Sequence, residues 1–166
     1  MAFDAFLKLD GIPGDSVDAA HKGEIQVLGF QGGLSNPVHI GSATGGAGAG
    51  KATFQDFQFT APVSSATPKL LLACASGQHI NSAILAVRKA GGKGPGGGLD
   101  FLKYTLTDVF VSSVTTGGAG SDEAVHEQFS LAFAKLQVSF QAENAAGGPA
   151  GTPITSGWDL RQNKQA

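Results

Sequence analysis

Apolar and polar side chains alternate along most of the chain, at the spacing of two that is typical of half-buried β-strands. Six segments carry this alternation together with β-branched or aromatic residues, and each is bounded by Gly, Pro, Asn or Ser. The segments are residues 3–9, 24–30, 54–60, 80–88, 102–114 and 128–141, and a last short strand is expected around Trp158 and Leu160. The pattern predicts six to eight strands in a mostly antiparallel order.

The alternation changes phase inside the two longest segments. In residues 102–114 the apolar positions are even up to Leu106 and odd from Val109 onward. In residues 128–141 they change from odd to even between Ala134 and Lys135. An odd-length slip exchanges the buried face of a strand, which long strands do at a bulge or a sharp bend. Two such strands predict a mostly β fold with a strongly curved sheet that closes, or nearly closes, into a barrel.

One short helix is expected over residues 68–76, where Leu and Ala are frequent. Thr67 is a suitable N-cap, and Pro68 fits the first helical turn because its missing N–H costs nothing there. Gly77 is placed to adopt the left-handed conformation that ends many helices. A helix this short is marginal alone, so it must pack on the barrel.

Composition narrows the class of protein. A chain of 166 residues fits one domain, residues 1–166, and 42% hydrophobic residues are enough for a core. A net charge of −2 argues against a nucleic-acid surface, and no apolar run is long enough for a transmembrane helix. The first residues lack the pattern of a secretory signal peptide, and a single cysteine, Cys74, suits a reducing compartment. The 25 glycines gather in the expected loops.

Residues 45–51, GGAGAGK, imitate a phosphate-binding P-loop, but the motif fails in two respects. Ala52 stands where a Mg²⁺-binding Ser or Thr belongs, and a strand is expected next instead of the helix that would bind phosphate. We therefore interpret the segment as a flexible loop with no nucleotide.

No other motif indicates catalysis, a metal or a cofactor. The four histidines have no metal-ligand spacing and are expected at the surface or in hydrogen bonds. Cys74 is expected to be a small buried side chain, and Asp122, Glu123 and Glu127 to form a solvated face. We expect a protein that is not an enzyme. The histidines are His21, His39, His79 and His126.

With these elements in place, the chain resembles the haemolysin-coregulated protein family (Hcp), which forms the inner tube of bacterial type VI secretion systems. The resemblance covers essentially the whole chain, and it rests on the joint order of several motifs rather than on any one. These are AFLKLDG at 5–11, TPKL at 67–70, ACASGQH at 73–79, VRKAGG at 87–92, VFVSSV at 109–114 and GWDLRQNK at 157–164.

The resemblance implies a small β-barrel of two packed sheets with one flanking helix. Six copies would form a ring, and rings would stack into a hollow tube that a contracting sheath expels together with its spike. Members leave the bacterial cytoplasm without a signal peptide and carry small effector proteins in the lumen. They have neither a cofactor nor a nucleic-acid or membrane partner.

Two segments are candidates for contacts in such an assembly. The loop at 32–52 is long for a strand connection, and long loops are usually functional. We expect it to contact a neighbouring subunit or ring through Gly41, Ser42, Gly45, Gly48 and Lys51.

The second candidate is the small polar segment at 112–120, which the resemblance places near the lumen or the ring face. We expect Ser112, Ser113, Thr115 and Ala119 to contact effectors. The alternatives are a monomeric, lipocalin-like barrel for a small ligand and a subunit similar to those of phage tail tubes.

Overall fold

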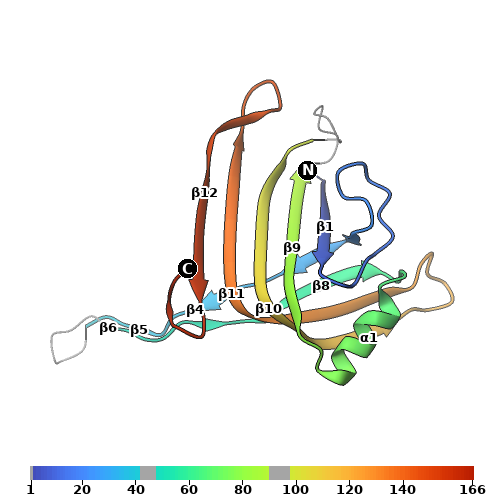
Figure 1. Cartoon of the computed structure of the whole chain (residues 1–166), viewed down its shortest axis with the longest axis horizontal. Helices are drawn as coiled ribbons and strands as arrows, with labels where there is room; N and C mark the ends of the chain where they lie inside the picture. The colour runs from blue at the N-terminus through green and yellow to red at the C-terminus, as the bar shows by residue number, and fades with distance from the viewer. Residues whose placement is uncertain (1, 42–47, 90–97) are drawn as a thin grey trace.

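Two strands of 18 residues each, β10 (Asp100–Gly117) and β11 (His126–Glu143), organise the fold. The computed structural model describes residues 2–41, 48–89 and 98–166. Both strands bend sharply, so that one half of each stands upright in Figure 1 and the other half turns underneath. Leu106 and Val109 are both buried although they lie an odd number of residues apart, and Asp108 between them has a left-handed φ of 55°. The change of buried face predicted for β10 from the alternation is therefore confirmed.

The side chain of Asp108 braces this bend. Its two carboxylate oxygens pair with His79 Nε2 at 2.9 Å and with Arg161 at 2.7 Å. These two partners, the hydrogen bond from His79 first, hold the pKa of Asp108 below its usual value. The bend in β10 is thus tied both to the segment after the helix and to the C-terminal segment.

The upright halves of β10 and β11 belong to a first sheet whose strand order is β13-β12-β11-β10-β9-β1-β2, with every pair antiparallel. The C-terminal strand β12 is longer than expected and stops one residue before Leu160. The further strands are β1 (Phe3–Leu9), β2 (Ile25–Val27), β9 (Ile80–Lys89), β12 (Pro149–Asp159) and β13 (Lys164–Gln165).

The other halves of β10 and β11 form a second sheet with β8 (Phe57–Pro62) and β3 (Gly29–Gln31). The chain passes from β2 in the first sheet to β3 in the second at Leu28, whose N–H donates to the carbonyl of Thr60 at 2.8 Å. The fold is therefore mostly β with two packed sheets, as predicted, and the two sheets share the strands β10 and β11. The described strands do not close into a continuous barrel, because the bent strands turn the sheet over on itself instead.

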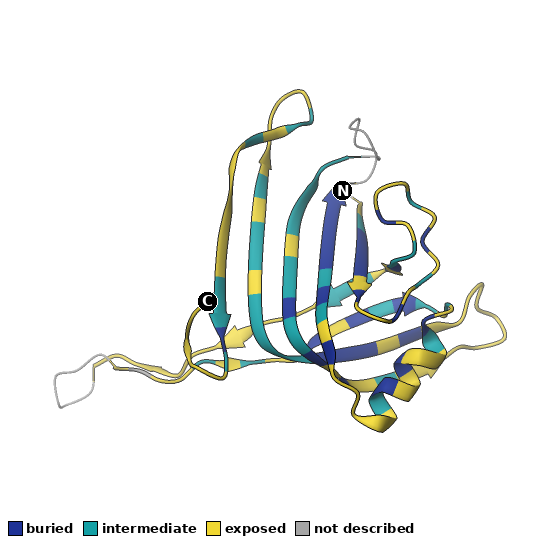
Figure 2. Cartoon of the chain, in the orientation of Figure 1, coloured by how far each residue is buried: buried dark blue, intermediate teal, exposed yellow. Residues whose placement is uncertain are grey.

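The core lies between the two sheets. Its aromatic part is a stack in which Phe59 lies 5.3 Å from Phe57 and 5.2 Å from Phe129, measured between ring centroids. In Figure 2 the buried positions gather on β1, β9 and the second sheet, whereas β12 is mostly exposed.

The helix α1 (Thr67–Ser76) flanks this core and buries Leu70 and Ala73. Gly77 ends it in the left-handed conformation, as expected. The expected N-cap is wrong, because Ala66 occupies that position and the Thr67 hydroxyl accepts a hydrogen bond from the N–H of Ser64 at 3.1 Å. Cys74 is half-buried against the core and not fully buried.

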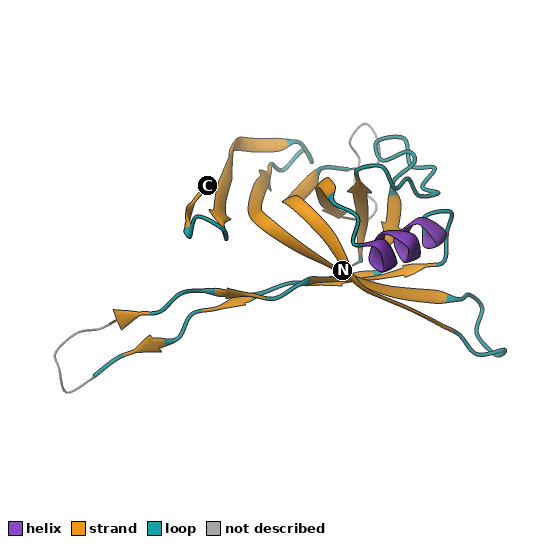
Figure 3. Cartoon of the chain, turned by 60° about the horizontal axis from the view of Figure 1, so that its bottom comes forward, coloured by secondary structure: helices purple, strands orange, loops and turns teal. Residues whose placement is uncertain are grey.

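A narrow arm projects from the second sheet, between β3 and β8. It is a ribbon of short antiparallel pairs, in which β4 pairs with β7 and β5 with β6. Figure 3 shows the arm running away from the body on the side opposite to α1. Its strands are β4 (Leu34–Ser35), β5 (Val38–His39), β6 (Gly48–Ala49) and β7 (Thr53–Phe54).

Candidate functional site

The structure brings together three of the four residues expected to contact effectors. Ser112, Ser113 and Thr115 are all exposed on the half of β10 that belongs to the second sheet. Ala119 lies beyond the end of β10, in a turn where its N–H donates to the carboxylate of Asp122 at 2.7 Å. Ala119 is therefore not part of the same sheet surface.

A β-bulge explains why two consecutive serines share one face. The pairing of β10 with β11 shifts between Val111 and Ser113, which leaves Ser112 as the extra residue. The hydroxyls of Ser112 and Ser113 lie 2.7 Å and 2.5 Å from the hydroxyl of Ser130 on β11. The sequence indicated hydroxyls near a strand end, whereas the structure joins them to a third serine in a hydrogen-bonded cluster.

The strand pairing extends this cluster into two rows of polar residues on the outer face of the second sheet. Residues directly opposite one another on antiparallel strands point to the same face. The first row is Gln31, Gln58, Ser130 and Ser113, on β3, β8, β11 and β10. The second row is Gly29, Thr60, Gln128 and Thr115 on the same four strands.

We call these two rows the polar face. They border a shallow cavity of about 400 Å³. Sequence reasoning missed Gln31, Gln58 and Gln128, although Gln58 and Gln128 lie next to buried phenylalanines and Gln31 lies next to the half-buried Phe30. The missing information was the pairing of strands far apart in the chain.

The long loop expected to make intersubunit contacts corresponds to the arm. Gly41 is exposed with a φ of 86°, Gly48 lies in β6, and Lys51 is exposed. Ser42 and Gly45 lie outside the described residues. The P-loop interpretation stays rejected, since Gly48 is in a strand and the next element in the described part of the chain is β7.

An apolar groove of about 540 Å³ lies where the arm leaves the body. Leu34 and Phe54 from the base of the arm face Leu136, Val138 and Trp158 from β11 and β12 across it. Leu34 remains 58% exposed, so this groove is an open apolar surface of the single chain.

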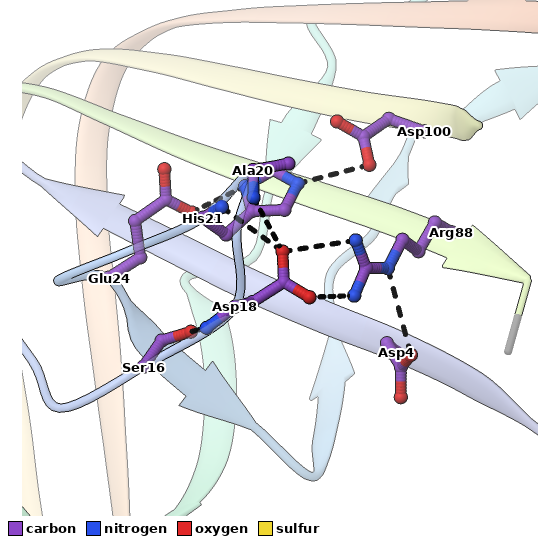
Figure 4. Close-up of polar contacts among 8 residues, drawn as sticks. All are labelled: Asp4, Ser16, Asp18, Ala20, His21, Glu24, Arg88 and Asp100. Atoms are coloured by element: carbon purple, nitrogen blue, oxygen red, sulfur yellow. Dashed lines mark hydrogen bonds and ion pairs between the residues drawn. The ribbon is translucent and has the colours of Figure 1, made fainter. Parts of the chain in front are cut away.

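A cluster of charged residues fastens the loop between β1 and β2 to the first sheet (Figure 4). His21 is buried, with Nδ1 at 2.7 Å from Glu24 and Nε2 at 3.1 Å from Asp100. Its ring stacks on Phe6 at a centroid distance of 4.5 Å. This histidine is hydrogen-bonded, as expected, and its partners come from the loop and from the start of β10.

Arg88 on β9 is the second centre of that cluster. Its guanidinium donates two hydrogen bonds to the carboxylate of Asp18 and lies 3.7 Å from Asp4. The hydrogen bonds to Arg88 are the main cause that lowers the pKa of Asp18, although burial opposes them. The same contact raises the pKa of Arg88. The cluster is a structural tie between the loop and the sheet.

Glu127 contradicts the expectation of a solvated acidic face. Its side chain is 1% exposed and points into the core side of β11, next to the start of α1. Neither carboxylate oxygen has a hydrogen-bond partner among the described residues. Burial raises its pKa, and the nearby hydroxyl of Thr67 lowers it by a smaller amount. Asp122 and Glu123, by contrast, are exposed.

Two further observations concern other kinds of function. The described residues contain no group of three or more His, Cys, Asp or Glu side chains arranged to hold a metal ion. Within the same described part, no helix is long and apolar enough to cross a bilayer.

Comparison with known proteins assigns the family. The model of the family described as "Type VI secretion system effector, Hcp" matches residues 6–140. The chain is 43% identical to protein hcp1 of Pseudomonas aeruginosa over 166 residues, which is the full length of both chains.

Solved structures agree with this assignment. Hcp1 from Salmonella typhimurium is 36% identical, with a TM-score of 0.80 over all of both chains. A type six secretion system protein is 31% identical, with a TM-score of 0.91 over 99% of this chain and 100% of its own. A cap protein of the anti-feeding prophage, 11% identical with a TM-score of 0.56, shares the fold alone.

The chain belongs to the Hcp family of type VI secretion proteins. The resemblance found in the sequence motifs is thereby confirmed, and so is the function as a ring-forming subunit of the type VI secretion tube. This assignment rejects the alternative of a monomeric, lipocalin-like barrel.

Proposed function

We propose that six copies of this tube subunit close into a ring by head-to-tail contact, and that the rings stack into a hollow tube. The first sheet has two unlike ends. One end carries β12 and the apolar groove, and the other carries β1 and β2 with exposed Phe3 and Leu28 nearby. Contacts between two different patches generate rings when the rotation closes.

The apolar groove is the observation that carries this proposal. Open apolar surfaces of this kind mark interaction sites on soluble proteins. The groove is continuous with the arm, whose Val38 and Ile40 are 54% and 86% exposed. A two-stranded ribbon is marginally stable alone in water. Both features therefore favour a neighbouring copy as the occupant, with the arm, including Gly41, Gly48 and Lys51, reaching that copy or the next ring.

We place the polar face toward the lumen of the ring, where Ser112, Ser113 and Thr115 contact small effector proteins. The support is the exposure of most of its side chains and the shallow cavity that it borders. A bulky substitution such as Thr115→Trp should reduce the retention of effectors in pull-down assays while the ring stays intact. Unchanged retention would remove Thr115 from the contact.

The remaining parts of the proposal concern the cellular context. The whole chain, residues 1–166, acts as a single Hcp-like domain without catalysis. The tube is assembled in the bacterial cytoplasm, fits inside a contractile sheath behind a spike, and is exported by that apparatus without a signal peptide. Loss of sheath contraction should abolish its appearance outside the cell, whereas loss of the general secretion route should leave it unchanged.

A pair of leucine substitutions tests the ring contact. Leu34 lines the groove and Leu71 lies on α1, and their exposed fractions are similar at 58% and 61%. Leu34→Lys should convert rings into monomers in analytical ultracentrifugation, because it places a charge in the contact. Leu71→Lys should leave rings intact. Equal effects of the two substitutions, or intact rings in both, would contradict the proposed contact.

A further inference from the structure

The polar face has a chemical property that neither the family nor the proposed lumen position requires: it carries no formal charge. The two rows across β3, β8, β11 and β10 contain no Asp, Glu, Lys or Arg. The charged residue of β11 nearest to these rows is Glu127, which is buried on the opposite face. Seven of the eight residues in these rows, all except Gly29, thus have polar side chains, and none is charged.

We infer that the polar face binds polypeptide segments that are uncharged and rich in hydrogen-bonding groups, by neutral hydrogen bonds alone. This inference rests on the proposed contact with effectors and specifies its chemistry. Each of Gln31, Gln58 and Gln128 offers two amide donors and a carbonyl acceptor. The hydroxyls of Thr60 and Thr115 add groups that both donate and accept. Backbone amides and Ser, Thr, Asn or Gln side chains of a partner match this set.

The serine cluster gives the surface a fixed element. Ser130 is only 6% exposed, lines the cavity, and is held by both Ser112 and Ser113. The two hydrogen bonds use two of the three serine hydroxyl donors, so one donor remains for another partner. The bulge in β10 holds these hydroxyls in place beside the glutamine row.

Neutrality has two consequences for binding. The two rows themselves offer charged partners no Coulomb attraction, so added salt has little to screen there. Single neutral hydrogen bonds contribute little net free energy, so one copy binds weakly and retention depends on several copies facing the same lumen. Effectors are then bound reversibly by several weak contacts, and the net charge of an effector does not determine its retention.

Three capped nonapeptides serve as probes: Ac-GSQSGSQSG-NH₂ and its variants with both Gln replaced by Glu or by Lys. Binding to the full-length protein is followed by the side-chain amide signals of Gln31, Gln58 and Gln128 in NMR spectra. We expect the neutral peptide to shift these signals, with a Kd that changes by less than about twofold between about 50 and 500 mM NaCl. Preferred binding of either charged peptide, or no shift with the neutral one, would overturn the inference.

Two single substitutions test whether the peptide binds at the polar face. Gln58→Lys lies in the centre of the first row and should weaken the neutral peptide by about fivefold or more, because it replaces an amide acceptor by a charge. It should also make binding of the Glu peptide salt-dependent. Gln78→Lys, on an exposed residue after α1, is the matched control and should change neither. Equal behaviour of the two variants would count against the polar face.

The same experiment separates this inference from the proposed function. Wild-type rings that retain no co-expressed effector at any salt concentration would contradict the proposed effector contact itself. Rings that retain effectors at about 50 mM NaCl and release them at about 500 mM would leave that contact standing and refute neutral recognition.

Discussion

Replacing Glu127 by Gln should make the protein more stable at neutral and mildly alkaline pH. The residue is 1% exposed, and neither carboxylate oxygen has a hydrogen-bond partner in the described part of the chain. Leaving a buried polar group without a partner costs about 1–3 kcal/mol, and more when it is charged. Gln has nearly the same size and cannot ionise, so Glu127→Gln removes the cost of charging this site.

The pH dependence gives the sign of the effect. Burial raises the pKa of Glu127 above its ordinary value of 4.5, so the folded state holds this proton more tightly than the unfolded state. The contribution to stability is therefore complete below the unfolded value and is lost as the pH rises through the folded one. Within this window the slope from one group reaches at most about 1.4 kcal/mol per pH unit.

The assay is urea denaturation of both proteins between about pH 4 and pH 9, at one protein concentration so that assembly contributes equally. We expect the two stability profiles to converge at the acidic end and to separate as the pH rises, with Glu127→Gln the more stable. Glu123→Gln, on an exposed neighbour, is the control and should follow the wild type. Parallel profiles for wild type and Glu127→Gln would refute the reasoning that the carboxyl is buried without a partner.

Three further predictions follow from other parts of the fold. Phe59→Ala should lower the free energy of unfolding by about 3–5 kcal/mol in chemical denaturation, because it empties the centre of the aromatic stack; a loss below about 1 kcal/mol would contradict that packing. Gly50→Ala should disturb the arm and weaken ring formation in native mass spectra, since a Cβ there would lie 2.6 Å from Pro37. A Cβ at Gly48 would have nothing within 4 Å, so Gly48→Ala should not weaken ring formation. Equal effects of the two substitutions would show that the arm accommodates Gly50→Ala. Asp18→Asn should lower the thermal stability at pH values above the ordinary pKa of a carboxyl group and leave it unchanged at lower pH, because the pKa of Asp18 is lowered in the folded state. A loss of thermal stability that is the same at every pH would show that the charge of Asp18 is not its cause.

The sequence was most informative about features that depend on the order of apolar and polar residues within a single strand. The phase change in β10 predicted the bend, because burial of both Leu106 and Val109 requires a local reversal of faces. The αL conformation of Asp108 could not be predicted with it, since it depends on support from His79 and Arg161, which are distant in sequence.

The alternation also carried information on Glu127 that its charge obscured, whereas it carried none on surfaces made by several strands. Glu127 occupies a buried position of β11 in phase with Phe129, so its period predicted burial while its charge suggested solvent. The structure shows that the period was the better guide. The polar face required the register of four strands, and that register is set by pairing between segments as distant in sequence as those of Phe57 and Leu131.

Native mass spectrometry of the purified protein, combined with negative-stain images of the same sample, tests the central claim most directly. Six chains of 16.7 kDa give a particle of about 100 kDa, and we expect this mass together with sixfold rings that enclose a central hole. A particle of 16.7 kDa at every protein concentration, with no rings in the images, would contradict the account.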